Sequence, residues 1–273
     1  MNIEGKVAIV TGAASGIGRA VAAELVHRGV AAVAMVDRCD AVKEAATGLD
    51  ESAGKKVCLL PFVGDVTDDS FRRAVFDEIA RKCGTSTICV PAAGITRDKL
   101  AVRLNKETGK AMLYPVEDFV SVLKVNLVAP VYWALEMVGK IAESRHARGL
   151  KRWAPPEHVE GTVIFIGSVS SHGIAGQIAY SATKAGLDGV SATLTQEAIF
   201  HGVRCAVIHP GFTDTPMVQA LGDEYIRQRI LPQTQLKRLV RPEEIAAAVC
   251  FMISDSAMSG DLWIDAGWHP QAA

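Results

Sequence analysis

The sequence predicts an α/β fold with a doubly wound parallel sheet of seven strands and helices on both faces. Short apolar runs recur along the chain, amphipathic segments separate them, and a glycine-rich turn follows the first run. The runs are continuous and rich in Val, Ile and Ala, as expected for strands covered on both faces. The predicted strands are KVAIVTG (6–12), AAVAMVD (31–37), KVCLLPFV (56–63), STICVPAAG (86–94), GTVIFIGS (161–168), VRCAVIHPG (203–211) and DLWIDAG (261–267).

Helical patterns fill the intervals between these runs. The clearest are GIGRAVAAELVHRG (16–29), DDSFRRAVFDEIARKCG (68–84) and RPEEIAAAVCFMISD (241–255). Because no low-complexity linker divides the chain, we expect a single domain over residues 1–273. Two stretches read as loop-like insertions in that domain, near 103–115 and 143–161.

The composition indicates which kind of molecule the protein binds. The chain has 273 residues, of which 49% are hydrophobic and 22% charged, so it can bury a substantial core. Its net charge of -1 and sequence pI of about 6.7 show no excess of positive charge of the kind that binds nucleic acid or an anionic membrane. The amino terminus reads as a strand and not as a secretory or transit peptide, and no apolar run approaches membrane-spanning length. We therefore expect a cytoplasmic protein with a small-molecule partner.

The cysteines and histidines indicate neither a disulfide framework nor a metal site. No C-x-x-C pair is present, and neither the cysteines nor the histidines show metal-ligand spacing. The cysteines are Cys39, Cys58, Cys83, Cys89, Cys205 and Cys250. The histidines are His27, His146, His158, His172, His201, His209 and His269. We expect reduced thiols and no metal, and a hydrolytic triad is set aside because no nucleophile elbow is present.

The turn after the first strand, TGAASGIG, places Gly12, Gly16 and Gly18 before a helix that begins near Gly16. Glycines there allow the backbone to approach a pyrophosphate, whose charge then lies at the positive end of the helix. A tight strand-to-helix turn would by itself explain two of them. Asp37 ends the second strand, where a dinucleotide site places a carboxylate on the adenosine ribose. The alternative role for Asp37 is a cap of the next helix.

The stretch YSATK places Tyr180 and Lys184 four residues apart, hence on one face of a helix. A phenol with a pKa near 10 is a poor base at neutral pH, and a neighbouring ammonium stabilises its phenolate. The pair is therefore a candidate for proton transfer, although this spacing also arises by chance on helix surfaces.

Taken in order along the chain, these motifs resemble the short-chain dehydrogenase/reductase family. The motifs are TGAASGIG, GDV (64–66), KVNL (124–127), IGS (166–168), YSATK (180–184) and HPGFTDTPM (209–217). The resemblance implies a Rossmann-type fold and a catalytic set in which Tyr180 exchanges the proton and Lys184 supports it. It further implies that Ser168 polarises the substrate oxygen and that Asn126 anchors a proton-relay water. A turn cap remains open for Ser168, and a helix cap or helix-to-sheet brace for Asn126.

The same resemblance implies the residues that contact the cofactor. They are Gly12, Ser15, Gly16, Ile17, Gly18, Asp37, Arg38, Asp65, Val66, Ala92, Ala93, Gly94, Tyr180, Lys184, Pro210, Gly211 and Thr213. Asp37 favours NAD, because its carboxylate would repel the 2'-phosphate of NADP, and Ala14 stands where NADP-preferring relatives often carry a basic residue. Arg38 could instead meet that phosphate or stack on the adenine. The chain departs from the family in PAAG (91–94), where two asparagines are common.

Two stretches bear on the substrate. GITRD (94–98) resembles 3-oxoacyl-carrier reductases, and RLNKETGKAMLYPVEDFVSVLKVNL (103–127) resembles NAD-dependent short-chain 3-hydroxyacyl-CoA dehydrogenases, the group of type 10 17-beta-hydroxysteroid dehydrogenase. They imply an oxidoreductase acting on a 3-hydroxyacyl or 3-oxoacyl thioester, or on a hydroxysteroid or other secondary alcohol. The remaining alternative is a catalytically silent NAD-binding regulatory or scaffold protein.

Other side chains carry weaker expectations. Apolar residues after the PG turn could line a lid over a hydrophobic substrate or could pack between helices; they are Met217, Leu221, Ile226, Ile230 and Leu231. A basic run could meet CoA or carrier phosphates or could be a solvated helix end; it comprises Arg145, Arg148, Lys151 and Arg152. The segments 126–142 and 180–200 are apolar around much of their circumference, which predicts a homo-oligomer, as in the tetramers of much of the family.

Overall fold

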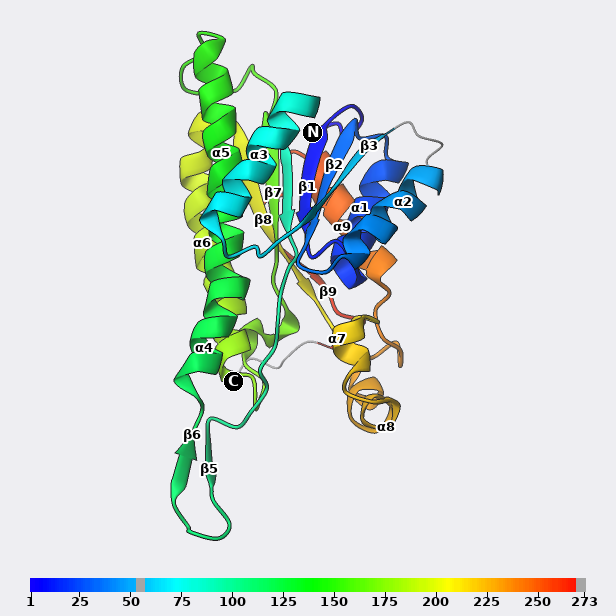
Figure 1. Ribbon diagram of the computed structural model, residues 1–273, viewed down its shortest axis with the longest axis vertical. Helices are drawn as coiled ribbons and strands as arrows, with labels where there is room; N and C mark the ends of the chain where they lie inside the picture. Colours follow the sequence, from blue (N-terminus) through cyan, green and yellow to red (C-terminus); the bar gives the residue numbers. More distant parts are fainter. Residues whose placement is uncertain (53–56, 269–273) are drawn as a thin grey trace.

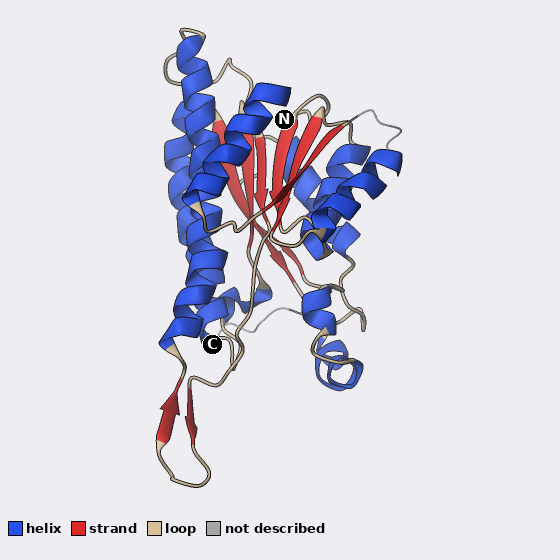
Figure 2. Cartoon of the chain, viewed as in Figure 1, coloured by secondary structure: helices blue, strands red, loops and turns tan. Residues whose placement is uncertain are grey.

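The computed structural model describes residues 1–52 and 57–268 and contains a seven-stranded parallel sheet (Figures 1 and 2). The strand order is β3-β2-β1-β4-β7-β8-β9. The strands are β1 (Val7–Thr11), β2 (Ala32–Asp37), β3 (Cys58–Val63), β4 (Ile88–Pro91), β7 (Gly161–Ile166), β8 (Val203–Pro210) and β9 (Gly260–Ile264). Each lies within or beside its predicted run, so the predicted fold class is confirmed; Lys56, at the start of the third run, lies outside the described residues.

Helices cover both faces of the sheet, as the continuous apolar runs require. One face packs against α1 (Gly16–His27), α2 (Ala41–Ser52) and α9 (Pro242–Ser254). The other packs against α3 (Asp69–Cys83), α5 (Ala129–Ala147) and α6 (Ile178–Glu197), and α4 (Val116–Leu123) extends from α5 and contacts α6. Successive residues of one strand therefore enter different cores: Val10 packs on the α1 side and Ile9 on the α5 side.

Shorter elements lie mainly near the carboxyl ends of the strands. They are the hairpin β5 (Val102–Leu104) and β6 (Ala111–Leu113), α7 (Pro216–Gln219), α8 (Asp223–Tyr225), the π-helical turns η1 (Lys124–Val128) and η4 (Ile226–Ile230), and the 3-10 turns η2 (Val169–His172), η3 (Ala198–His201) and η5 (Leu231–Gln233). Except for η3, which precedes the start of β8, they lie toward the end of the sheet where the order of strands reverses between β1 and β4. Ligands of doubly wound folds bind at such a reversal.

Trp133 of α5 fixes the loop after β3 to the core. Its indole is fully buried and donates a hydrogen bond of 2.9 Å to the carbonyl of Val66. The rings of Phe71 and Phe76 on α3 lie with centroids 6.5 and 5.7 Å from the indole. This packing holds the Gly64–Val66 turn at the carboxyl end of the sheet.

The two predicted insertions differ in structure from the expected loops. Residues 102–113 form an antiparallel hairpin that projects from the molecule (Figure 2). Its turn is stabilised by Asn105, whose side chain accepts hydrogen bonds from the main-chain N–H groups of Glu107 and Thr108. The second insertion begins inside α5, which continues to Ala147, and only residues 148–160 connect irregularly to β7.

Two members of the predicted basic run, Arg145 and Arg148, pair with carboxylates, and Arg152 lies over the ring of Phe200. Arg145 is buried, and its Nη1 lies 2.8 Å from Glu157 and 2.9 Å from Glu160. Arg148 also pairs with Glu160 at 2.9 Å. These pairs hold residues 148–160 against α5, at the amino-terminal end of the sheet, opposite the strand reversal (Figure 1). Arg145 and Arg148 are therefore committed to pairs within the chain.

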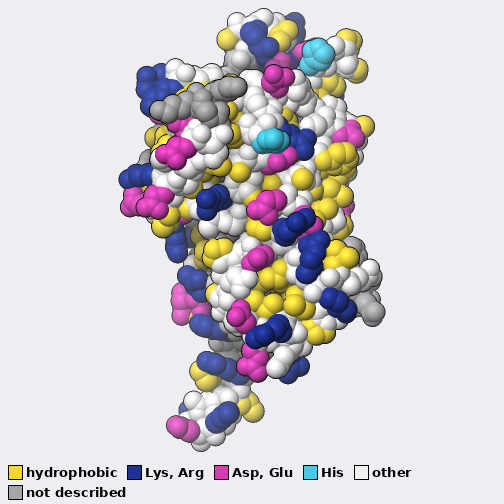
Figure 3. Space-filling view, turned by 90° about the vertical axis from the view of Figure 1, so that its right-hand side faces the viewer, with side chains coloured by type: hydrophobic (Ala, Val, Ile, Leu, Met, Phe, Trp, Pro, Cys, Tyr) yellow, Lys and Arg dark blue, Asp and Glu magenta, His cyan; other side chains and the backbone are white. Residues whose placement is uncertain are grey.

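One expectation about membranes needs correction. The helical run Val116–Ala147 is long and apolar enough to cross a membrane by length and composition. Its inner side contributes Trp133, Met137 and Ile141 to the core, so part of its apolar character is explained by packing on the sheet. On the face shown in Figure 3, basic and acidic side chains are interspersed, with hydrophobic side chains between them. The expected cytoplasmic location stays a prediction.

Candidate functional site

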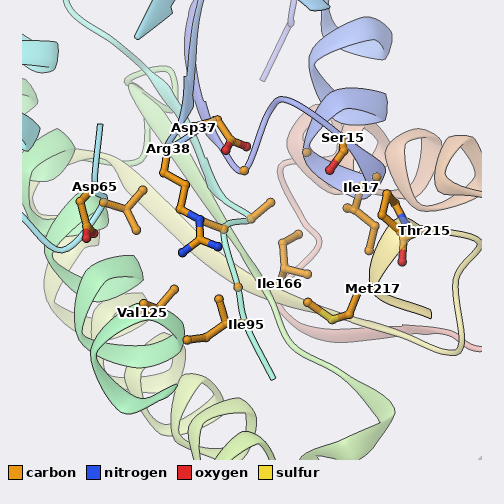
Figure 4. Close-up of a pocket in the computed structure, with 18 of the residues that line it drawn as sticks. Ser15, Ile17, Asp37, Arg38, Asp65, Ile95, Val125, Ile166, Thr215 and Met217 are labelled. Carbon is orange, nitrogen blue, oxygen red and sulfur yellow. The ribbon is translucent and has the colours of Figure 1, made fainter. Parts of the chain in front are cut away.

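A cavity of about 300 Å³ opens at the carboxyl ends of the central strands (Figure 4). It runs from the turn after β1, past the ends of β2 and β4, to the face of α6. Fourteen of the predicted cofactor or catalytic residues line it: Gly12, Ser15, Gly16, Ile17, Gly18, Asp37, Arg38, Asp65, Val66, Ala92, Ala93, Gly94, Tyr180 and Lys184. The structure thus brings the sequence-distant motifs together around one space.

The glycine turn is built so that side chains are excluded from it. Gly12 and Gly16 adopt left-handed backbone angles, with φ of 66° and 52°. A Cβ on Gly12 would lie 2.9 Å from the main chain of Ala93, and one on Gly18 would lie 2.3 Å from the carbonyl oxygen of Gly12. Because these positions have no side chain, the turn packs closely against the main chain that follows β4, and the amino terminus of α1 faces the cavity.

The amino terminus of α1 fits an anionic group. Ser15 is the N-cap residue in extended conformation, and its side chain makes no capping hydrogen bond. The first N–H groups of a helix lack partners within the helix and carry partial positive charge. Together with the glycines, they form a cradle of the kind that holds a pyrophosphate.

Asp37 is oriented by the main chain around it. Its Oδ2 accepts a hydrogen bond of 3.1 Å from the N–H of Ala14, and its Oδ1 accepts one of 3.0 Å from Cys39. The carboxylate joins the end of β2 to the glycine turn, and it lies ahead of α2, which begins at Ala41. Arg38 extends from the same strand end into the cavity (Figure 4).

The opposite wall is formed by the ends of β3 and β4. The side chain of Asp65 accepts two hydrogen bonds from Thr67, at 2.8 and 2.7 Å, and so closes the turn that begins α3. In the PAAG sequence, the N–H of Ala93 donates to the hydroxyl of Thr11 at 3.1 Å. Small side chains at Ala92 and Ala93 leave this strand end close to the glycine turn, with main-chain groups available in place of the missing amides.

Tyr180 and Lys184 both reach the cavity from α6, as their spacing predicts. Lys184 is 5% exposed, its ammonium donates a hydrogen bond of 2.7 Å to the carbonyl of Ile166 at the end of β7, and it lies 5.4 Å from the centre of the Tyr180 ring. Burial lowers the pKa of Lys184 to about 8. Burial raises the pKa of Tyr180 to about 12, and a hydrogen bond with Ser168 acts in the opposite direction.

Ser168 is 8% exposed and begins the 3-10 turn after β7. Its hydroxyl oxygen accepts a hydrogen bond of 3.0 Å from the N–H of Ser170, so the turn-cap role is present in the structure together with the contact to Tyr180. Behind it lies a residue that the sequence did not single out, His209. Its Nδ1 is 3.3 Å from the N–H of Ser168, and its Nε2 is 3.2 Å from a carboxylate oxygen of Asp188.

Asn126 is fully buried inside the π-helical turn η1 between α4 and α5, and it does not begin a helix as expected. Its side-chain oxygen accepts from the N–H of Ile95 at 2.9 Å, and its amide donates to the carbonyl of Ile95 at 2.8 Å. Asn126 therefore braces the helix to the loop that follows β4, and not to a strand of the sheet itself. A π turn leaves the helical hydrogen-bond ladder locally altered, a feature frequent at functional sites.

Three predicted cofactor residues lie outside the cavity lining. Pro210 ends β8, Gly211 and Thr213 follow it, and a Cβ on Gly211 would lie 2.6 Å from Asp265. The chain enters the cavity slightly later, at Thr215, Pro216 and Met217, of which Met217 was expected as part of a lid. Sequence reasoning missed the other added lining residues, whose types are common throughout the fold: Gly64, Ile95, Val125, Ile166, Thr215 and Pro216. Within residues 1–52 and 57–268, no group of three or more His, Cys, Asp or Glu side chains could hold a metal ion, and His269 lies beyond that part.

Comparisons with known proteins identify relatives of this chain. A family model described as enoyl-(acyl carrier protein) reductase matches residues 12–269. The 3-oxoacyl-(acyl-carrier-protein) reductase FabG of Escherichia coli strain K12 is 34% identical over 258 residues, which cover 94% of this chain and 93% of the relative. FabG of Thermotoga maritima is 31% identical over 261 residues, covering 94% of each protein.

A solved structure of a related protein has the same fold. The crystal structure of a short-chain type dehydrogenase/reductase from Mycobacterium marinum aligns with a TM-score of 0.79 and 26% sequence identity, over 98% of this chain and 96% of that one. The match runs through the whole sheet and its flanking helices. The chain therefore belongs to the short-chain dehydrogenase/reductase family and is an oxidoreductase that transfers a hydride between a nicotinamide cofactor and a ketone or alcohol.

Proposed function

We propose that this oxidoreductase interconverts a secondary alcohol and a ketone with NAD(H), and that Tyr180 exchanges the proton. The observation that carries the proposal is the placement of Tyr180 and Lys184 on the wall of a cavity whose other end is the glycine cradle. Gly12, Gly16 and Gly18 would hold the pyrophosphate, and Asp37 the adenosine ribose. When bound, the nicotinamide supplies the hydride acceptor or donor.

Tyr180 and Lys184 divide the acid–base work between them. In alcohol oxidation, the Tyr180 phenolate takes the hydroxyl proton of the substrate; in ketone reduction, the phenol returns it. The ammonium of Lys184 favours the phenolate, and its hydrogen bond to Ile166 keeps that charge beneath the phenol. Because Lys184 points into the cavity region between Tyr180 and β7, it is also positioned for the nicotinamide ribose hydroxyls.

Ser168 and Asn126 have supporting roles in this proposal. The Ser168 oxygen already accepts from Ser170, so its O–H remains able to donate to the substrate oxygen. Asn126 holds the main chain of Ile95, a cavity residue, through two hydrogen bonds. The π turn around Asn126 is where a proton-relay water would be anchored.

For the substrate we propose a 3-oxoacyl or 3-hydroxyacyl thioester. The relatives named above are 3-oxoacyl-(acyl-carrier-protein) reductases. The cavity that Tyr180 lines also has apolar side chains on its walls, among them Ile95, Val125 and Met217, which suit an acyl chain. Ile226 and Ile230 are buried and pack within the fold, so only part of the expected lid is available. A hydroxysteroid remains the second substrate class, because the same apolar wall suits it.

NAD is the proposed cofactor because Asp37 occupies the ribose end of the cavity with its carboxylate fixed by two N–H groups. A fixed carboxylate can accept from ribose hydroxyls, and it repels a 2'-phosphate. Arg38 lies beside it and can stack on the adenine ring or approach a phosphate. The carboxylate cannot move away without losing its contacts to Ala14 and Cys39.

A homo-oligomer is the proposed assembly, with a tetramer as the expected form. Apolar side chains on the outer side of the α4–α5 run are partly exposed, including Val128 at 42%, Tyr132 at 49% and Leu135 at 41%. A second copy of the chain would cover them, which explains why this helix is apolar on more than its sheet-facing side.

The first prediction concerns Tyr180→Phe. This variant should retain cofactor binding and the far-UV circular dichroism spectrum while kcat falls by about 100-fold to 10,000-fold, because only the proton-transfer group is lost. Steady-state kinetics with 3-oxoacyl and 3-hydroxyacyl thioesters measure the effect, and Tyr132→Phe serves as a control outside the cavity. If Tyr180→Phe keeps a large part of wild-type turnover, the assignment is wrong. A silent NAD-binding protein would show no turnover in the wild type either.

The second prediction concerns cofactor choice. The wild type should prefer NAD(H) by about tenfold or more in kcat/KM, which corresponds to about 1.4 kcal/mol. Asp37→Ala should weaken NAD and improve NADP, because it removes both the ribose acceptor and the repulsion. Asp40→Ala is the matched control, since Asp40 pairs with Lys43 at the exposed start of α2. Equal or better kcat/KM with NADP in the wild type would overturn the role given to Asp37.

The third prediction concerns assembly. Multi-angle light scattering at micromolar protein should give the mass of a homo-oligomer, with about four chains expected. The reason is that a subunit interface would remove the exposed apolar side chains of Val128, Tyr132 and Leu135 from water. The chain mass is 29.0 kDa. A mass of one chain at that concentration would remove the proposal of a homo-oligomer.

A further inference from the structure

Two cysteines that the sequence leaves far apart meet at the amino-terminal end of the sheet. Cys58 is the first residue of β3, and Cys83 is the last residue of α3. Their sulfur atoms lie 3.4 Å apart. Both thiols are free, Cys58 is exposed and Cys83 is half-buried. Thiols at this separation are in contact, and a disulfide needs its sulfurs at about 2.0 Å.

The main chain holds both residues in place. The N–H of Cys58 donates to the carbonyl of Ala31 at 2.9 Å, which ties it to the neighbouring strand. The N–H of Gly84, just after Cys83, donates to the carbonyl of Ala80 at 3.1 Å and closes the end of α3. The contact therefore joins two regular elements. A further approach of about 1.4 Å would close the bond, which side-chain rotation can contribute.

We propose that Cys58 and Cys83 are a site of reversible oxidation, at which a peroxide converts the pair to a disulfide that stabilises the β3–α3 unit. This inference is independent of the proposed substrate and cofactor. The pair lies at the end of the sheet opposite the cavity, so the modification leaves the cavity residues chemically unchanged.

The exposed thiol is the first to react. Cys83 lies at the carboxyl terminus of α3, where the helix dipole disfavours an anion, and burial raises its pKa to about 11. Cys58 on the edge strand is accessible to an oxidant in solution. Its thiolate attacks one oxygen of hydrogen peroxide, the O–O bond breaks, and a sulfenic acid and hydroxide form.

The second step closes the bond. The Cys83 sulfur attacks the sulfenic sulfur of Cys58, the S–O bond breaks, and the departing hydroxide takes up the proton of the Cys83 thiol as water. In total, two thiols lose two electrons and two protons, and one peroxide becomes two waters. A dithiol reductant such as dithiothreitol reverses the reaction by thiol–disulfide exchange.

The disulfide would affect a specific part of the fold. Between the two cysteines, the chain passes through β3, the Gly64–Val66 turn and α3. A cross-link at the open end of this unit joins residues separated by 25 positions in the sequence and lowers the conformational entropy of the unfolded chain. The Gly64–Val66 turn lines the cavity, so oxidation would add stability to one of its walls.

The test uses the full-length protein, treated with hydrogen peroxide and then alkylated with iodoacetamide under denaturing conditions. The reduced protein should take up six labels, the number of its cysteines. The oxidised protein should take up two fewer, and peptide mapping without reductant should find Cys58 linked to Cys83. Tm should rise by about 5 °C or more and return to the starting value with dithiothreitol.

Matched variants separate this pair from other oxidation. Cys58→Ser and Cys83→Ser should each abolish the linked peptide and the rise in Tm, whereas Cys39→Ser, at another exposed cysteine, should keep both. Six labels after peroxide, a link between other cysteines or between chains, or an unchanged Tm in the linked protein would overturn the proposal. The wild-type peptide map gives this answer even if a serine variant folds poorly.

Discussion

The buried ammonium of Lys184 is the constraint on which the geometry of the site depends. A charge with only 5% of its residue surface exposed requires a fixed partner, and the carbonyl of Ile166 provides it at 2.7 Å. This hydrogen bond joins α6 to the end of β7, so Tyr180 on the same helix is placed relative to the sheet. Because the cavity lies at that end of the sheet, one contact relates the proposed acid–base pair to the nucleotide cradle.

The cofactor end depends on main-chain contacts in a similar way. Gly12 and Gly18 remove side chains where backbone segments approach, and Asp37 accepts a hydrogen bond from the N–H of Ala14 in the turn that they form. The PAAG sequence, which lacks the two asparagines common in the family, fits this arrangement, because the N–H of Ala93 donates a hydrogen bond to the hydroxyl of Thr11. The cradle therefore keeps its shape without the side-chain amides of the common family motif.

The sequence predicted the features that follow from periodicity and close packing. Continuous apolar runs identified all seven sheet strands, and the i, i+4 spacing placed Tyr180 and Lys184 on one wall. It did not predict the hairpin at 102–113, whose three-residue strands are too exposed to show an alternating pattern. The π turn at Asn126 and the position of His209 behind Ser168 arise from tertiary contacts, which have no local signal.

The most direct test of the account is the pH dependence of kcat/KM for alcohol oxidation in the wild type and in Lys184→Met. Oxidation requires the Tyr180 phenolate, so the rate should rise with pH in both proteins. Removing the ammonium takes away the charge that favours this phenolate, so the rising limb of the variant should move upward by about one pH unit or more. A rising limb at the same pH in both proteins would contradict the coupling of Lys184 to Tyr180.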